Sequence, residues 1–125
     1  MSQPLTQSPG TPPATFLDFP LALELDQLDA HIAILGIPFG LPYQPHEMAN
    51  DQSRAPDAIR QSAHMASYTR DHFDWDLGGP LLDSRDIKVV DCGNVTADLT
   101  DSRKHYQRAE QAVRKILASG ATLIA

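Results

Sequence analysis

Short, mostly apolar runs occur three times along the chain, at residues 31–36, 87–91 and 121–125. Their β-branched residues and their length are typical of strands that are buried on both faces of a sheet. Each run is closed or preceded by a glycine, which marks where an element begins or ends. We therefore expect three strands. The second should end where Gly93 and Asn94 turn the chain, and the third should be an interior strand of the sheet.

A helical pattern separates the first two runs. Ser53 is placed to cap this helix, Pro56 lies near its first turn, and Asp57 lies at the positive end of the helix dipole. Small or apolar residues then share one predicted face: Ala58, Ile59, Ser62, Ala63 and Ala66. Because small side chains let a helix approach a sheet closely, we expect this face to lie on the strands.

A second helical pattern opens at Ser102. Its apolar residues recur at i, i+3, i+7, i+10 and i+11 and form one stripe: Tyr106, Ala109, Val113, Ile116 and Leu117. Lys115 lies in the last turns, and Gly120 is placed as the C′ residue that ends the helix. The third strand follows directly.

The resulting order is strand, helix, strand, helix, strand, which predicts an α/β fold with right-handed crossovers and a parallel sheet. In such sheets, functional sites gather beyond the carboxyl ends of the strands. Because nothing follows the third strand, we expect the chain to be the front part of an α/β enzyme. A complete flavodoxin-like domain would need more strands than this pattern contains.

Residues 1–30 differ from the rest in composition. The first twenty contain Pro4, Pro9, Pro12, Pro13 and Pro20 among Ser, Thr and Gln, a mixture that resists helix formation. We interpret residues 1–30 as a Pro-rich N-terminal arm, either a tail or an arm over a neighbouring subunit, and residues 31–125 as part of an α/β domain. The leucine-rich piece at residues 21–28 fits a short helix and an extended docking segment equally poorly.

Composition narrows the functional classes. A hydrophobic fraction of 42% with 21% charged residues indicates a folded protein. The net charge of −6 without a basic cluster argues against nucleic-acid binding, so small-molecule or protein partners are expected. No apolar run is long enough to span a membrane and no signal sequence is present. With the single Cys92, interpreted as a small buried side chain, this predicts a cytoplasmic protein.

The segment after the first strand is the best candidate for a site. The apolar pattern is lost from Ile37 to Ser53, and long irregular segments inside compact domains are usually functional or disordered. Its candidate substrate-loop residues are Tyr43, His46, Glu47, Asn50, Asp51 and Arg54. The alternative is that these residues only solvate a loop or cap the next helix, with Arg60 bracing that helix through a salt bridge. Both interpretations stay open.

Other polar clusters are given structural interpretations. Residues 71–76 contain three carboxylates and one imidazole, but their spacing matches neither a calcium loop nor a helical histidine pair. We interpret them as a solvated acidic loop with Phe73 and Trp75 tucked inward. His31 precedes a strand and so lies at the wrong edge for a metal site. Gly36 and Gly40 lack the spacing of a nucleotide-binding loop.

Three blocks of sequence together resemble the ureohydrolase family of arginases and agmatinases. They are residues 32–39 (Ile-Ala-Ile-Leu-Gly-Ile-Pro-Phe), 54–60 (Arg-Ala-Pro-Asp-Ala-Ile-Arg) and 89–95 (Val-Val-Asp-Cys-Gly-Asn-Val). The resemblance implies a three-layer α/β/α arginase-like fold and a homo-oligomer, commonly a trimer or hexamer. It also implies two manganese ions whose bridging water attacks a guanidinium carbon and releases urea.

The departures from the family pattern concern the site. Gly40 stands where many members have Asp, Ala55 replaces a Gly before Pro56, and Asn94 replaces an Asp. These departures leave the identity of the substrate open. The family's metal-ligand motifs, Gly-Gly-Asp-His-Ser, Asp-Ala-His-x-Asp and Ser-x-Asp-x-Asp, are all expected after Ala125. No catalytic or metal residue is therefore assigned here.

The resemblance thus implies the N-terminal part of an agmatinase-like manganese enzyme that acts on a small guanidino compound and is inactive on its own, with no metal bound to this chain. Its loop would overhang the metal site, where Glu47 or Asp51 could pair with a cationic tail and Asn50 could hydrogen-bond it. The alternative is a stand-alone, non-catalytic α/β protein that binds a related enzyme subunit or a ligand.

Overall fold

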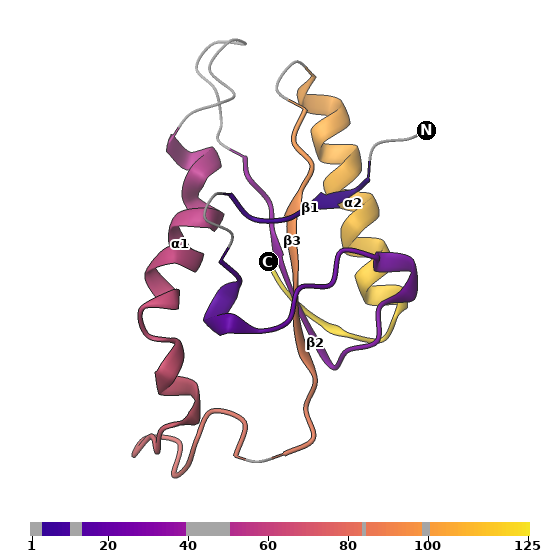
Figure 1. The fold of residues 1–125 in the computed structure, drawn as a ribbon. Helices are drawn as coiled ribbons and strands as arrows, with labels where there is room; N and C mark the ends of the chain where they lie inside the picture. The colour runs from indigo at the N-terminus through magenta and orange to yellow at the C-terminus, as the bar shows by residue number, and fades with distance from the viewer. Residues whose placement is uncertain (1–3, 11–13, 40–50, 84, 99–100) are drawn as a thin grey trace.

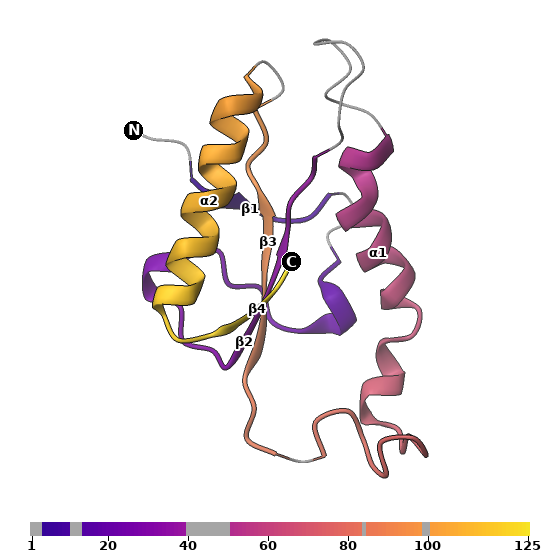
Figure 2. The same ribbon diagram turned by 180° about the vertical axis from the view of Figure 1, so that it is seen from behind.

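The computed structural model describes residues 4–10, 14–39, 51–83, 85–98 and 101–125. A sheet of four strands in the order β1-β3-β2-β4 lies between two helices, α1 and α2, which cover its opposite faces (Figures 1 and 2). The elements are β1 (Thr6–Gln7), β2 (Ile32–Gly36), α1 (Ala55–His64), β3 (Val89–Val95), α2 (Ser102–Ala118) and β4 (Thr122–Ile124). This arrangement confirms the predicted α/β fold class.

The three predicted strands pair in parallel, and a fourth strand joins them from the N-terminal arm. Ile32 of β2 lies opposite Val89 of β3 on one side and opposite Thr122 of β4 on the other. Strand β1 pairs antiparallel with β3, with Thr6 opposite Val95. The sheet is therefore mixed. A two-residue strand held by backbone hydrogen bonds has no apolar alternation from which it could be predicted.

The arm lies along β3 and covers that edge of the sheet. The Thr96 amide donates to the Leu5 carbonyl at 2.8 Å, and the Asp91 amide donates to the Pro20 carbonyl, also at 2.8 Å. Two short 3-10 turns, Phe16–Asp18 and Leu25–Gln27, interrupt the arm. The described part of the arm thus packs on its own chain, and it protects a strand edge that would otherwise be free to pair with another protein.

Strand β4 forms the opposite edge of the described sheet. It pairs with β2, Leu123 is partly buried, and 55% of Ile124 is exposed. The described residues place one strand beside β4, so they do not test the prediction of an interior strand, which concerns a longer enzyme.

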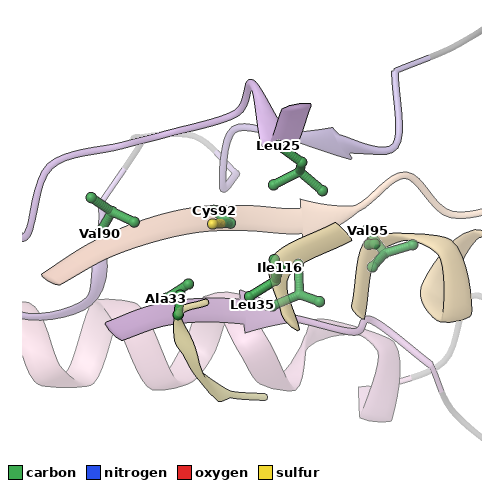
Figure 3. Close-up of a cluster of buried hydrophobic side chains, with 9 residues drawn as sticks. Leu25, Ala33, Leu35, Val90, Cys92, Val95 and Ile116 are labelled. Carbon is green, nitrogen blue, oxygen red and sulfur yellow. The ribbon is translucent and has the colours of Figure 1, made fainter. Parts of the chain in front are cut away.

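The hydrophobic core lies between the sheet and α2 (Figure 3). Its buried residues are Leu25, Ala33, Leu35, Val90, Cys92, Val95, Ala112, Ile116 and Ala121. Cys92 is fully buried, which confirms its interpretation as a small core side chain. Among the described residues, no helix is both long and apolar enough to cross a membrane.

Helix α2 begins at Ser102 as predicted, but its buried face is rotated from the predicted stripe. The Asp101 carboxylate caps the helix by accepting from the amides of Arg103 and Lys104. The buried residues are His105, Ala112 and Ile116, whereas Tyr106 and Leu117 are each 55% exposed. The apolar stripe is wider than the sheet beneath it, so one flank of the stripe stays outside the core.

The acidic segment at residues 71–76 also differs from its prediction. Phe73 is 57% exposed and Trp75 is 89% exposed, so neither ring is tucked inward. The rings contact each other instead, edge to face, with centroids 5.0 Å apart. The Asp74 carboxylate accepts the amides of Asp76 and Leu77, which fixes a tight turn and holds the aromatic side chains away from the core.

Candidate functional site

A cavity of about 440 Å³ opens between α1 and the ends of strands β2 and β4. It lies at the carboxyl edge of these parallel strands, where sites in α/β sheets usually form. Most of its lining is apolar, and it comes from both strand ends, the first turns of α1 and the arm. The lining residues are Phe16, Ile34, Leu35, Gly36, Ile37, Phe39, Gln52, Ala55, Pro56, Ile59, Arg60, Ile124 and Ala125.

Arg60 gives this cavity its charged wall, and Asp91 compensates that charge. The Arg60 side chain is 3% exposed and that of Asp91 is 0% exposed. Arg60 Nε donates to Asp91 Oδ2 at 2.9 Å, and Nη2 donates to Asp91 Oδ1 at 3.0 Å. The other Arg60 donors reach the Gly93 carbonyl at 2.9 Å and the Asn94 side-chain oxygen. A two-pronged pair of this kind is both strong and geometrically specific.

The ion pair continues into a network that joins three parts of the chain. Asn94 Nδ2 donates to Asp57 Oδ1 at 2.8 Å, which links β3 to the first turn of α1. From the arm, the Gly10 amide donates to Asp57 Oδ2 at 3.0 Å, and the Phe16 amide donates to Asp91 Oδ2 at 2.8 Å. The arm, α1 and β3 are thus held together by polar contacts around one guanidinium.

A bulge in β3 makes this network possible. Ile34 lies opposite Asp91 and Gly36 lies opposite Asn94, so β3 has one more residue than β2 between these positions. Gly93 takes up the extra residue with φ of +72°. In a regular strand, Asp91 and Asn94 would point to opposite faces. The bulge turns both side chains toward α1, and the predicted turn at Gly93 and Asn94 is wrong because the strand continues to Val95.

Helix α1 attaches to the sheet through this network rather than through small residues. Arg60 is its buried residue, while Ala58, Ile59 and Ser62 are exposed, so the predicted packing face is wrong. Ser53 is not the cap either: the helix begins at Ala55, with Arg54 at the N-cap position and no capping side-chain hydrogen bond. Periodicity of small residues could not reveal this, because a charged residue occupies the face turned to the sheet.

Gly36 lets the chain leave β2 close to α1. A Cβ atom at this position would lie 2.0 Å from Asn94 Oδ1 and 2.9 Å from Pro56 Cβ. The segment that follows β2 therefore starts in direct contact with the network and runs along the cavity, which Ile37 and Phe39 line. This placement explains why a glycine ends the first predicted strand.

The predicted substrate-loop residues are only partly described. Tyr43, His46, Glu47 and Asn50 lie outside the described residues. Asp51 and Arg54 begin and end a 3-10 turn, Asp51–Arg54, that leads into α1. Gln52, within this turn, lines the cavity, and Arg54 is exposed. The structure thus brings the end of the predicted loop to the cavity. Arg60 braces α1 by salt bridges, as the alternative interpretation stated: one reaches Asp91 in β3 at 2.9 Å, and a longer one reaches Asp57 within α1 at 3.5 Å.

His105 is a buried titratable residue that the sequence analysis did not single out. It is 1% exposed, and its ring stacks on Phe39 with centroids 5.4 Å apart. Neither ring nitrogen has a hydrogen-bond partner among the described residues. Burial lowers its pKa, as does the charge of Arg108, while Asp98 opposes the shift. Its spacing of seven from Ala112 is the sequence signal that places it on the buried face.

The described residues do not fit a manganese pair. Among them, no three His, Cys, Asp or Glu side chains gather closely enough to hold a metal ion. Burial, and then the charge of Asp91, raises the pKa of Cys92 to about 11, which leaves this thiol a poor nucleophile at neutral pH. The described part of the cavity can hold an apolar or extended group, and it carries no acid, base or nucleophile.

Comparison with known proteins places the chain in a wider context. A model of the arginase family matches residues 30–125. The agmatinase of Photorhabdus laumondii is 29% identical over 109 residues, which are 87% of this chain and 33% of the relative. Agmatinases of Escherichia coli O1:K1 and Enterobacter sp. strain 638 are 26% identical over 110 residues, with the same shares. The chain therefore spans about a third of the length of these curated relatives.

Proposed function

The chain belongs to the arginase family, and from this we propose that it is the N-terminal part of an agmatinase-like ureohydrolase. The reaction would be hydrolysis of a guanidino C–N bond with release of urea. The observation that carries the proposal is the family match over residues 30–125, which includes β2, α1, β3, α2 and β4. The agmatinase names of the relatives favour a small guanidino substrate.

Manganese belongs to this proposal as a property of the intact enzyme. The family is generally manganese-dependent, yet the described residues offer no group of three ligands. We therefore assign the two ions to ligands outside these residues and expect the 125-residue chain to be inactive on its own. A cytoplasmic location and a homo-oligomer of three or six subunits complete the proposal for the whole enzyme.

The contribution of this chain would be one wall of the substrate pocket. The cavity between α1 and the strand ends supports this role, because it lies at the carboxyl edge of β2 and β4. Gln52, within the turn Asp51–Arg54, lines this cavity. In this proposal Glu47 or Asp51 pairs with a cationic substrate tail, and Asn50 donates or accepts a hydrogen bond. Tyr43, His46 and Arg54 complete the same loop.

The gene beyond codon 125 tests the proposal directly. We expect the reading frame to continue through Gly-Gly-Asp-His-Ser, and we expect the longer product, loaded with manganese, to release urea from a guanidino compound. The matched control is the 125-residue chain under the same conditions, which should release none. Urea release from the short chain would contradict its proposed inactivity, and a stop codon directly after codon 125 would contradict the fragment proposal.

A second candidate is a stand-alone, non-catalytic protein that binds a related enzyme subunit or a ligand. Within the described residues, β4 pairs with β2 on one side, and an apolar cavity lies beside it. Both features favour this alternative, because a strand of another subunit could pair with the other side of β4. A stop codon after codon 125, together with binding to a full-length agmatinase in an equilibrium assay, would support it over the enzyme fragment.

A further inference from the structure

A second cavity, of about 510 Å³, lies at the amino edge of the sheet, where β3 begins. The segment after α1 turns at the foot of the molecule and returns to β3 (Figure 1). The walls come from the arm, from the end of the 3-10 turn Ser67–Asp71 and from residues 80–89, so the described chain forms this cavity by itself. A volume of this size is typical of small-molecule sites.

The floor of the second cavity is apolar and packed. Phe19 and Val89 are each 7% exposed, and Leu82 beside them is partly buried. The guanidinium carbon of Arg70 lies over the Phe19 ring, 5.1 Å from its centroid. Arg70 Nη1 also donates to the Leu17 carbonyl at 2.9 Å. The arm is thus fixed against the turn that follows α1, and the floor is formed before any ligand arrives.

The lining of the second cavity has a net charge of +1, although the chain as a whole has a charge of −6. Three cations and two carboxylates contribute to it: Arg70, Arg85, Lys88, Asp71 and Asp83. Arg70 is compensated in part, because its Nε lies 3.8 Å from Asp71 Oδ2. The remaining positive charge belongs to the side of the cavity where β3 begins.

Arg85 is the cation of this lining that keeps free donors. Its Nε donates to the Leu82 carbonyl at 3.1 Å, which orients the side chain. Within the part of the chain that the structure describes, no carboxylate pairs with Arg85 and its two terminal nitrogens form no hydrogen bond. A guanidinium with both terminal nitrogens free offers a fork that can hold the two oxygens of a carboxylate.

The backbone of the cavity walls is strained. Three non-glycine residues among those described have positive φ: Leu17 at 49°, Asp18 at 59° and Asp83 at 49°. The first two directly precede Phe19, and Asp83 itself lines the cavity. Because such conformations persist only where the surroundings hold them, they concentrate at ligand sites and switches. All three lie in the two segments that form the walls of this cavity.

We propose that the second cavity binds a small monocarboxylate with an apolar chain. The carboxylate pairs with the terminal nitrogens of Arg85 and with Lys88, and the chain lies on the floor that Phe19 and Val89 form. Lys88 is available, because its pair with Asp29 spans 3.5 Å between side chains that are 54% and 95% exposed, and water screens such pairs.

The carboxylates of the lining select for a single negative charge. A monoanion balances the net charge of +1, whereas a phosphate dianion exceeds it and is repelled by Asp71 and Asp83. An apolar chain is required as well, since most of the remaining lining is apolar and gains free energy when a methylene chain covers it.

This site does not depend on the proposed hydrolysis. The two cavities lie at opposite edges of the parallel strands and share no lining residue. Carboxylate binding and urea release can therefore succeed or fail separately.

An NMR titration of the isotope-labelled 125-residue chain with sodium hexanoate tests the proposal. We expect saturable chemical-shift changes at the amides of Phe19, Arg85 and Lys88. The amides of Ile37 and Phe39, which line the first cavity, should stay unchanged. Acetate, which lacks the chain, and 1-hexanol, which lacks the charge, should each bind at least about tenfold more weakly. Inorganic phosphate should also bind more weakly than hexanoate.

Arg85→Gln removes the guanidinium at an exposed position, so the fold should be kept. It should weaken hexanoate binding by about tenfold or more, since hydrogen bonds to charged groups are the stronger ones. Lys88→Gln, also at an exposed position, should weaken binding in the same direction. Arg114→Gln is the matched control, because it makes the same change on α2 at a side chain that is 75% exposed. It should leave the affinity unchanged.

The proposal is overturned if hexanoate causes no saturable shift, or if the shifts follow basic side chains over the whole surface. It is also overturned if Arg85→Gln binds hexanoate as tightly as the wild type does. Equal binding of acetate and hexanoate would refute the role of the apolar floor, and equal binding of 1-hexanol would refute the role of the charge.

Discussion

The guanidinium of Arg60 and the carboxylate of Asp91 form a two-pronged ion pair inside the protein, with Nε to Oδ2 at 2.9 Å and Nη2 to Oδ1 at 3.0 Å. Their side chains are 3% and 0% exposed. A buried charge is tolerated only when it is paired and hydrogen-bonded, and here both conditions are met. The pair attaches α1 to the sheet, on the face opposite α2. The α-helical residues of the buried apolar cluster come from α2, so apolar contacts hold α1 less than they hold α2.

Replacing Arg60 with Met should lower the free energy of unfolding by about 3–5 kcal/mol, because Asp91 would stay buried without a counter-charge. Chemical denaturation followed by circular dichroism measures this change. The double variant Arg60→Met with Asp91→Leu should lose less than the two single changes together, since it leaves no uncompensated charge.

Arg114→Met is the control for this prediction. Arg114 forms an ion pair with Glu110 at 2.8 Å, but the two side chains are 75% and 61% exposed. Water screens such pairs, so the change in unfolding free energy should stay below about 1 kcal/mol. If the Arg60 variant is no less stable than the Arg114 variant, the central role of the buried pair is refuted.

Gly93→Ala should loosen the arm as well as destabilise the domain. Gly93 has φ of +72°, and an added Cβ would lie 2.1 Å from the Gln7 carbonyl oxygen in β1. The backbone conformation alone costs an alanine about 1–2 kcal/mol, and the contact with β1 adds to this. We expect lower stability on denaturation and faster proteolytic cleavage of the arm.

Gly78→Ala separates the two effects of that substitution. Gly78 also has φ of +72°, but among the described residues, its two chain neighbours aside, no atom lies within 4 Å of the Cβ that would be added. This variant should show the backbone cost of about 1–2 kcal/mol and normal proteolysis of the arm. Equal behaviour of the two variants would mean that the approach of β1 to Gly93 is unimportant for holding the arm.

The sequence predicted those elements whose signal is local. Residues 31–36 and 102–118 follow the expected strand and helix because burial, periodicity and end signals agree there. The attachment of α1 could not be predicted in the same way. Arg60 and Asp91 are 31 residues apart, and a charged residue on the buried face contradicts the pattern rule until its partner is known. Strand β1 is likewise defined by backbone pairing with a distant strand.

The predicted site segment can be compared with the structure only at its two ends. Ile37 and Phe39 at its start and Gln52 near its end line the cavity at the carboxyl edge of the parallel strands, and the role of the loop residues between them stays a prediction. The bulge at Gly93 could not be predicted, since Gly followed by Asn reads equally well as a turn. It determines which side chains face α1, so the network of Asp91 and Asn94 became visible only in the structure.

Cys92 should be unreactive in the folded protein. Its side chain is fully buried, and burial raises its pKa to about 11, with a further contribution from the charge of Asp91. At about pH 8 the thiol therefore stays protonated, whereas an unfolded cysteine is partly ionised. A thiol reagent such as DTNB should label the chain only in denaturant. Cys92→Ala gives the baseline, and rapid labelling of the native protein would contradict the buried position.

His105 should make the protein less stable as the pH falls. Burial and Arg108 lower its pKa in the folded state, against the opposing charge of Asp98. The unfolded histidine titrates near about 6.5. Above that pH neither state is protonated, so the stability is complete. Below it the unfolded state gains a proton first, and the free energy of unfolding therefore declines with decreasing pH.

The variant His105→Leu isolates this effect, because leucine cannot take up a proton and leaves no ring nitrogen unpaired at a site that is 1% exposed. Unfolding free energies measured from about pH 8 to about pH 5 should fall less steeply for this variant than for the wild type. At the acid end the variant should be the more stable protein, because it avoids both the protonation and the burial of unpaired polar atoms. His72→Gln, at an exposed histidine, should follow the wild-type curve. If wild type and His105→Leu lose stability in parallel, His105 does not control the acid sensitivity of the fold.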